Sequence, residues 1–165
     1  MLHRSDYYFE EDVYKTLKLK NVIFNPSARE SHNCKEYMEI QKMIKWGVIC
    51  MEGPELIPIN EKIDISELSK SARVQTGSDP HKILMINARE IMKSKKDDVV
   101  FERSNIDVTD TEKKIVVECG LTSARKLLGT FNNKIEGIED IKEFWILQSY
   151  DKNNRSNLYK FKKNK

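Results

Sequence analysis

The chain has 165 residues, of which 33% are charged and 39% hydrophobic, and its net charge is +3. This composition is typical of a polar globular protein of about one domain and argues against general disorder. The sequence has no run of 18 apolar residues and no apolar segment near its start, so it predicts no membrane span and no secretory signal. Three widely spaced cysteines give no disulfide framework. We therefore expect a cytoplasmic protein that does not interact with membranes.

Residues 1–78 are expected to form a mainly helical extension or a small domain. Hydrophobic spacing predicts helices over residues 8–19 and 33–46, with Gly47 as the stop of the second helix. The segment 48–51 reads as a short strand that Gly53 and Pro54 interrupt, and 57–59 as a separate edge piece. The turn composition at Thr76, Gly77 and Ser78 marks the predicted boundary.

Residues 79–165 read as an α/β domain with a mixed sheet flanked by helices. Asp79 and Pro80 are typical of a helix start, and the helix is expected to run to about Lys95. A second helix is expected to start at Thr122 or Ser123. The predicted strands cover residues 99–101, 105–109, 115–119, 144–147 and 158–161. The strand 115–119 is apolar on both faces, so it should be central in the sheet.

Two acidic residues stand within these apolar strands. Asp107 and Glu118 are eleven residues apart, and a turn at 110–113 would make them neighbours on one face of a hairpin. Burying a carboxylate is unfavourable unless it is paired, and close carboxylates are typical ligands of Mg²⁺ or Mn²⁺. Glu90 is expected on or beside the buried stripe of the preceding helix, and His81, in its first turn, is expected to be exposed. Alternatively, Asp107 and Glu118 are solvated acids.

The order of elements and the segments Ile106-Asp107-Val108 and Ile115 to Gly120 resemble the core of the PD-(D/E)XK, or restriction-endonuclease-like, nuclease superfamily. The resemblance covers about residues 79–150. It implies a restriction-endonuclease-like fold and metal-assisted hydrolysis of a phosphodiester bond in nucleic acid, with DNA as the expected substrate. It also implies that Asp107, Glu118 and the Cys119 main-chain carbonyl bind Mg²⁺ or Mn²⁺, with Glu90 as the acid of the helix.

One position departs from the superfamily pattern. Where the motif has a lysine, this chain has Gly120. We hypothesise that Lys126 supplies the missing cation, because side chains tilt back toward the start of their helix and residue 126 would lie about one turn in. Arg125 and Lys114 are weaker candidates. The catalytic residues expected on this basis are Asp107, Glu118 and Lys126.

Basic residues are concentrated toward the C-terminal end. Residues 1–78 contain 11 basic and 12 acidic side chains, whereas residues 79–165 contain 18 and 14. Basic side chains bind phosphates, although a solvated lysine-rich tail explains the same pattern. The candidate nucleic-acid-binding residues are Arg125, Arg155, Lys160 and Lys162.

Three functions therefore remain open at this point. The first is a metal-dependent nuclease. The second, suggested by Gly120, is a catalytically inactive nucleic-acid-binding module of the same fold. The third is a protein-interaction domain unrelated to nucleic acid. The sequence leaves the assembly open, with a homodimer as one possible form.

Overall fold

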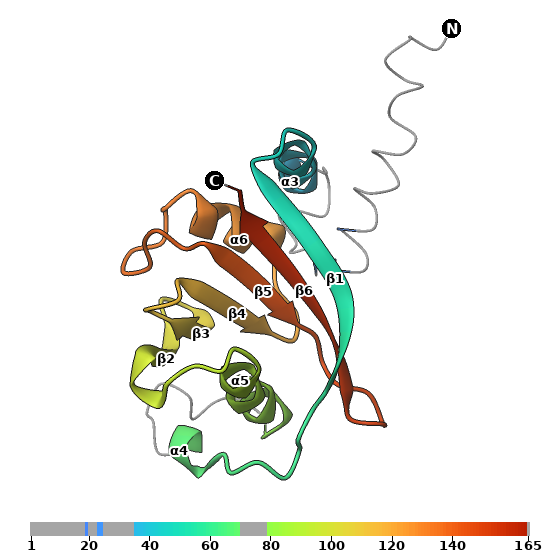
Figure 1. The fold of residues 1–165 in the computed structure, drawn as a ribbon, viewed down its shortest axis with the longest axis vertical. Helices are drawn as coiled ribbons and strands as arrows, with labels where there is room; N and C mark the ends of the chain where they lie inside the picture. Colours follow the sequence, from blue (N-terminus) through green and yellow to red (C-terminus); the bar gives the residue numbers. More distant parts are fainter. Residues whose placement is uncertain (1–18, 20–22, 25–34, 70–78, 165) are drawn as a thin grey trace, which may run out of the picture.

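A computed structural model describes residues 19, 23–24, 35–69 and 79–164. These residues form an α/β structure in which helices cover both faces of one six-stranded mixed sheet (Figure 1). The strands are β1 (Ile49–Pro58), β2 (Val99–Arg103), β3 (Ile106–Asp110), β4 (Ile115–Cys119), β5 (Glu143–Leu147) and β6 (Arg155–Lys163). The α-helices are α3 (Lys35–Lys45), α4 (Ser66–Ser69), α5 (Asp79–Ile91) and α6 (Ala124–Phe131), and a 3₁₀ helix covers Lys96–Asp98.

The strands lie in the order β1-β6-β5-β4-β3-β2. Only β4 and β5 run parallel, and α6 makes the connection between them; the other neighbours are antiparallel. Residues 99–119 contain three consecutive strands, and all five residues of β4 are buried between β5 and β3. The predictions of these strands and of a central strand at 115–119 are confirmed.

Each face of the sheet has its own hydrophobic core. On one face, Val116 of β4 packs in a cluster with residues of α3 and α6, including Tyr37 and Leu127. On the other face, Val117 packs in a cluster with residues of α4 and α5, including Leu84. Both faces of β4 are therefore covered, which explains why its sequence is a continuous apolar run broken only by Glu118.

The turn between β3 and β4 is fixed by a buried acid. The Asp110 carboxylate is fully buried and accepts hydrogen bonds from the main-chain N–H groups of Glu112 (3.0 Å) and Lys113 (2.8 Å). An aspartate that satisfies main-chain donors two and three residues ahead is a typical turn former. The predicted turn at 110–113 is present, and it aligns β3 and β4.

The predicted division of the chain at residue 78 does not divide the sheet. Strand β1 comes from the first part of the chain, yet it pairs along its length with β6. Gly53 and Pro54 do not end the strand, contrary to our prediction. The register shifts between Glu52 and Glu55, so β1 passes this pair as an irregularity and continues to Pro58. An edge strand tolerates this irregularity because one of its sides has no partner strand.

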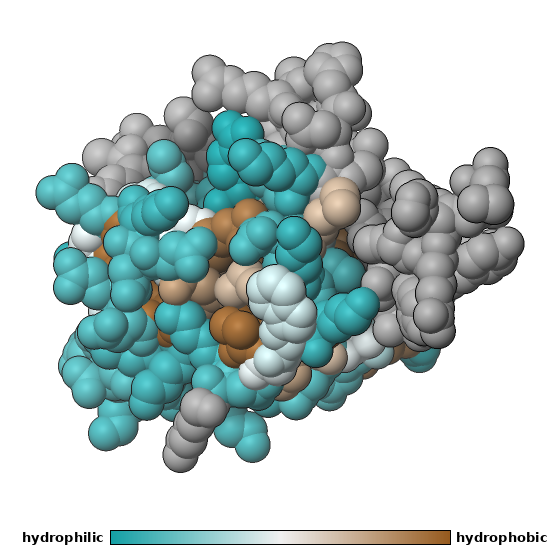
Figure 2. Space-filling view, turned by 90° about the horizontal axis from the view of Figure 1, so that it is seen from above, coloured by the Kyte–Doolittle hydropathy of each residue, from teal (hydrophilic) through white to brown (hydrophobic). Residues whose placement is uncertain are grey.

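The remaining predictions for the first part are partly tested. Helix α3 confirms the helix expected over 33–46, and Gly47 follows it with a φ of +74°. The helix expected over 8–19 lies outside the described residues, apart from Leu19. Within the described ranges, no helix has the length and apolar character needed to cross a membrane. Figure 2 shows a largely hydrophilic surface, with a small hydrophobic area, on the side seen from above.

Candidate functional site

The hairpin of β2 and β3 places two acids opposite each other. Its turn consists of Ser104 and Asn105, whose φ angles of 54° and 63° are those of a tight two-residue hairpin turn. Because Phe101 pairs with Val108 and Arg103 with Ile106, Glu102 lies across from Asp107. Like charges directly opposite each other are unfavourable in a sheet, so this pair requires a cation or a proton.

The main-chain pairing of β3 and β4 ends just before Asp107 and Glu118. The last paired residues are Val108 and Val117. Beyond them, Asp107 Oδ2 accepts a hydrogen bond from the Cys119 N–H (2.8 Å), and Glu118 Oε2 accepts one from the Asp107 N–H (3.0 Å). Each side chain thus bonds to the main chain of the opposite strand. Asp107 and Glu118 are neighbours at this fork between β3 and β4, as the sequence predicts.

Helix α6 brings Lys126 to the fork. The Lys126 ammonium lies 2.5 Å from Glu118 Oε1 and donates to the Asn105 carbonyl at 2.8 Å. The Ser123 hydroxyl accepts a hydrogen bond from the Lys126 N–H and caps the helix, so the helix starts where the sequence predicts. The Thr122 hydroxyl donates to the same Glu118 oxygen at 3.3 Å. The hypothesis that Lys126 leans back toward the end of β4 therefore matches the geometry.

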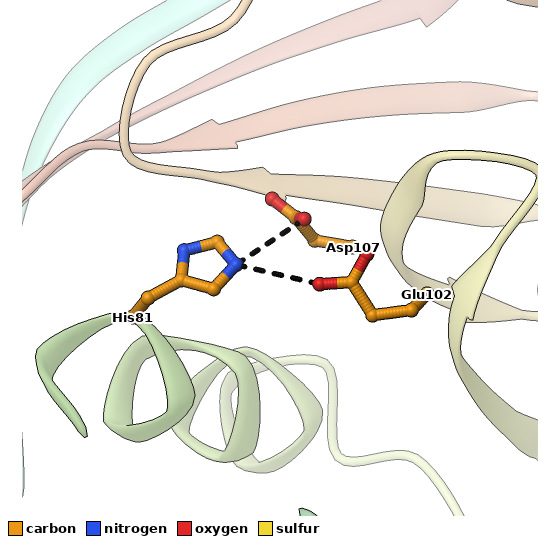
Figure 3. Close-up of side chains that lie close together, drawn as sticks. All are labelled: His81, Glu102 and Asp107. Atoms are coloured by element: carbon orange, nitrogen blue, oxygen red, sulfur yellow. Dashed lines mark ion pairs between the residues drawn. The ribbon is translucent and has the colours of Figure 1, made fainter. Parts of the chain in front are cut away.

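Helix α5 contributes His81 rather than Glu90. His81 Nε2 lies 3.3 Å from Asp107 Oδ1 and 3.6 Å from Glu102 Oε1 (Figure 3). These three residues offer ligand atoms within 4.8 Å of one another, the one such group of His, Cys, Asp and Glu found among the described residues. Glu118 is not a member of the group, although it is bonded to Asp107.

Glu90 does not lie on the buried stripe of α5, where the sequence placed it as the acid of the helix. Glu90 is exposed, and it lines a separate hollow with Arg89 and Glu67 near the end of α5. The helix turns its buried stripe, with Leu84 and Ala88, toward the sheet, and Glu90 falls off that stripe. His81 is three and seven residues before these two, a spacing that places it on the same face. That spacing was the available signal for His81, which is half-buried rather than exposed.

The two buried acids of the fork differ in their affinity for protons. Burial raises the pKa of Glu118 to about 7, and the adjacent Asp107 carboxylate acts in the same direction against the Lys126 ammonium. Burial also acts to raise the pKa of Asp107, but hydrogen bonds from His81 and from the Cys119 N–H outweigh it and lower the pKa. Asp107 is therefore the charged member of the pair at neutral pH, and Glu118 is poised between its two forms.

In the outer part of the site, the His81 imidazole lies between two acids, Asp107 and Glu102. The hydrogen bond to Asp107 raises the pKa of His81, although burial opposes the shift. Burial and the charge of Asp107 raise the pKa of Glu102. Three acids, one imidazole and one ammonium thus share the site, an arrangement in which a divalent cation can take the place of a proton on the imidazole.

The donor atoms fit a hard or borderline divalent metal. His81 Nε2, Asp107 Oδ1 and a Glu102 oxygen provide one imidazole and two carboxylates, and Glu118 adjoins them. Carboxylates suit Mg²⁺ and Mn²⁺, and an imidazole shifts the preference toward Mn²⁺ or a later transition metal. The Cys119 side chain is buried and its thiol pKa lies well above the usual value, so this sulfur is not a thiolate ligand.

The predicted nucleic-acid-binding residues lie at separate places in the fold. Arg125 bonds to Glu36 of α3 at 3.0 Å, and Lys160 lies over the Trp145 ring, 4.2 Å from its centroid. Lys162 lies 3.0 Å from Glu52, at the end of β5 and β6 opposite to the site. Arg155 is exposed at the start of β6, beyond the residue that pairs with the end of β5.

Comparison with known proteins gives no relative for this chain: no protein-family model, no curated protein and no solved structure matches it.

Proposed function

We propose that the chain is a metal-dependent nuclease that hydrolyses phosphodiester bonds of nucleic acid, with DNA as the first substrate to test. The observation that carries the proposal is the contact of Lys126 with Glu118, at a fork whose other carboxylate is Asp107. A lysine beside two carboxylates is the chemistry that the PD-(D/E)XK motif supplies, here with the lysine moved from position 120 to the next helix.

The arrangement of elements supports the same proposal. The order α5-β2-β3-β4-α6-β5, with β4 and β5 parallel, is the order on which the resemblance to the restriction-endonuclease-like core rests. We propose that the chain has that core, extended at one edge by β6 and β1.

The residues of the site have separable roles in this proposal. His81, Glu102 and Asp107, with Glu118 beside them, would hold Mn²⁺ or Mg²⁺, and the resemblance adds the Cys119 carbonyl. When bound, such an ion lowers the pKa of a coordinated water and neutralises charge on the phosphate. Lys126 keeps an ammonium at the fork, where it can stabilise the charge that develops on the phosphate oxygens. Thr122 and Asn105 hold Glu118 and Lys126 in place.

The test is a cleavage assay on plasmid DNA and on single-stranded DNA and RNA, with Mn²⁺, Mg²⁺ or EDTA. Metal-dependent cleavage should fall by about 10²–10³ in Lys126→Met, because removal of one preorganised donor to a developing charge has an effect of this size. Lys134→Met is the matched control, since Lys134 is an exposed lysine just after the same helix.

Two results would contradict the proposal. If wild type binds nucleic acid but cleaves none with either metal, the chain is a catalytically inactive nucleic-acid-binding module. If Lys126→Met and Lys134→Met cleave equally well, Lys126 has no catalytic role. Where wild type shows metal-dependent cleavage, Asp107→Asn should abolish it.

A further inference from the structure

A hollow of about 550 Å³ adjoins the carboxylate site and has no role in the chemistry described above. It lies between the first turns of α5 and the loops that follow β4 and β5. Its lining includes His81, Cys119, Leu84, Leu121, Ser149 and Tyr150. Because β4 and β5 are parallel, both loops leave the same edge of the sheet, the edge at which α/β proteins bind ligands.

The lining of the hollow indicates what kind of group it takes. Its volume is within the range of about 300–1,000 Å³ that small-molecule pockets span. Apart from His81, the described residues that line the hollow carry no charged side chain, so this part of the lining offers little to a phosphate. Tyr150 supplies an aromatic ring and Ser149 a hydroxyl, which are the groups that stack on a flat heterocycle and hydrogen-bond to its edge.

Two further features keep the hollow open and apolar at its mouth. Gly120 lines it, and a Cβ at this position would meet no atom closer than the Ser149 hydroxyl, at 3.9 Å. The space that a motif lysine would occupy is thus open. Leu121 also lines the hollow and is 76% exposed, so its side chain offers an apolar surface at the mouth.

We propose that this hollow binds one unpaired nucleobase of the strand being cut, next to the scissile phosphate. The inference rests on the proposed nuclease function and adds a substrate class to it. His81 belongs both to the hollow and to the ligand group, so a base in the hollow leaves its own phosphate beside the carboxylates. A base in a duplex must first be unstacked and unpaired, so single strands are the preferred substrate.

The first test uses the unaltered protein, so it does not depend on the folding of a variant. A series of single-stranded oligonucleotides carries one abasic site that moves along the strand, in DNA and in RNA. With Mn²⁺, cleavage of the bond next to the abasic site should fall about tenfold, while the other bonds of the same strand serve as internal controls. The matching duplex should be cut more slowly than the single strand.

The second test changes the hollow. Tyr150→Leu should raise the KM for the single strand about tenfold with a smaller change in kcat, because stacking contributes to substrate binding. Tyr150→Phe keeps the ring and should retain most of the affinity that Tyr150→Leu loses. Leu121→Ser should raise KM, whereas Leu56→Ser, on an exposed leucine of β1 outside the hollow, should not.

The outcomes separate this inference from the function on which it rests. If the abasic site leaves the cleavage pattern unchanged, or if the duplex is cut as fast as the single strand, the hollow is no base subsite and the nuclease proposal stands without it. If the protein cleaves no strand of either kind with Mn²⁺ or with Mg²⁺, both proposals fall.

Discussion

His81 is the residue that distinguishes this site from a simple pair of carboxylates. It comes from the first turn of α5, and its Nε2 faces Asp107 and Glu102 at 3.3 and 3.6 Å. For the proposed metal site, an imidazole at this point would add a nitrogen ligand to a set of oxygen ligands. A nitrogen ligand strengthens Mn²⁺ binding relative to Mg²⁺ binding, because Mg²⁺ prefers oxygen.

We predict that His81→Ala lowers the affinity for Mn²⁺ by at least about tenfold, since even residues that only support metal ligands contribute 10–100-fold. The affinity for Mg²⁺ should fall less. Isothermal titration of both metals into wild type and variant measures the difference. His81→Ala must first be shown to unfold cooperatively, and equal Mn²⁺ affinities for the two proteins would remove His81 from the site.

A second prediction for a single residue concerns Glu118 and the way in which the stability of the metal-free protein depends on pH. The pKa of Glu118 is about 7 in the folded state and about 4.5 for an unperturbed glutamate, so between these pH values the folded state binds more protons than the unfolded state. The free energy of unfolding therefore falls as pH rises through this window, by on the order of 1–3 kcal/mol. Glu118→Gln, which cannot ionise, should lose this contribution.

Urea unfolding at pH 5 and pH 7 in EDTA gives the comparison for both proteins. His81 has a raised pKa, so its contribution to stability is present below about pH 6.5 and is lost as pH rises through its folded pKa. This contribution of His81 is the same in wild type and in Glu118→Gln. It is lost largely at pH values above the range in which Glu118 acts. The prediction is contradicted if wild type and Glu118→Gln lose equal stability between the two pH values.

At the scale of elements, the start of α6 sets the position of Lys126. Ser123 caps the helix by accepting the Lys126 N–H at 3.2 Å, and Lys126 reaches Glu118 from the first turn. A helix that started one residue later would turn the lysine away from the fork by about 100°. The cap therefore contributes to the geometry of the site as well as to the stability of the helix.

We predict that Ser123→Ala lowers the free energy of unfolding by about 1 kcal/mol, the usual effect of losing a cap. Ser123→Asp should retain most of the stability, because aspartate caps equally well and its charge suits a helix N-terminus. Urea denaturation measures both variants. If the alanine variant is as stable as wild type, the hydrogen bond to Lys126 N–H has no energetic importance.

The strands of the second half were predictable because each is a short apolar run bounded by polar turns. The register of Asp107 and Glu118 followed from the short turn between β3 and β4. Glu90 and His81 were not assigned correctly, because a helix phase depends on which side chains meet the sheet and a difference of one residue moves a side chain by about 100°. Glu102 was missed because its position depends on the tight turn at Ser104 and Asn105 and on its own positive φ of 55°, a conformation that glutamate rarely adopts.

The course of β1 shows a different limit. Gly and Pro in succession normally end a strand, and local sequence alone gave no reason to continue it. The strand continues because β6 pairs with it on both sides of the irregularity, from Ile49 with Lys163 to Pro58 with Arg155. That partner is about a hundred residues away in the sequence, so the outcome depends on a tertiary contact.

At the scale of the whole molecule, both helix layers contribute to one edge of the sheet. Helix α5 lies on one face and brings His81 from its first turn, while α6 lies on the other face and brings Lys126. Helix N-termini carry a partial positive charge that favours nearby anions. The site thus lies where two helix N-termini and the fork between β3 and β4 meet.

Because β1 belongs to the same sheet as the later strands, we predict that residues 79–165 do not fold on their own. Removal of residues 1–78 would expose the edge of β6 along its pairing with β1 and would remove Ile49, Tyr37 and Ile40 from the core. Exposed edges and lost core contacts favour aggregation. We expect the fragment 79–165 to aggregate or to lack a cooperative thermal transition, as gel filtration and circular dichroism would show. A monomeric fragment that melts at the temperature of the full chain would contradict this expectation.

The bonds at the fork between β3 and β4 also affect how this protein could change during evolution. Asp107 bonds to the main chain of β4, and Glu118 to the main chain of β3, so replacing either acid weakens the sheet as well as the chemistry. Lys126 is different, because Glu118 can take up a proton when the ammonium is gone. If the proposed nuclease activity holds, a lineage relieved of selection for that activity would retain both acids for the sake of folding and would lose the lysine first. Among related sequences, position 126 would be the one to separate active descendants from inactive ones.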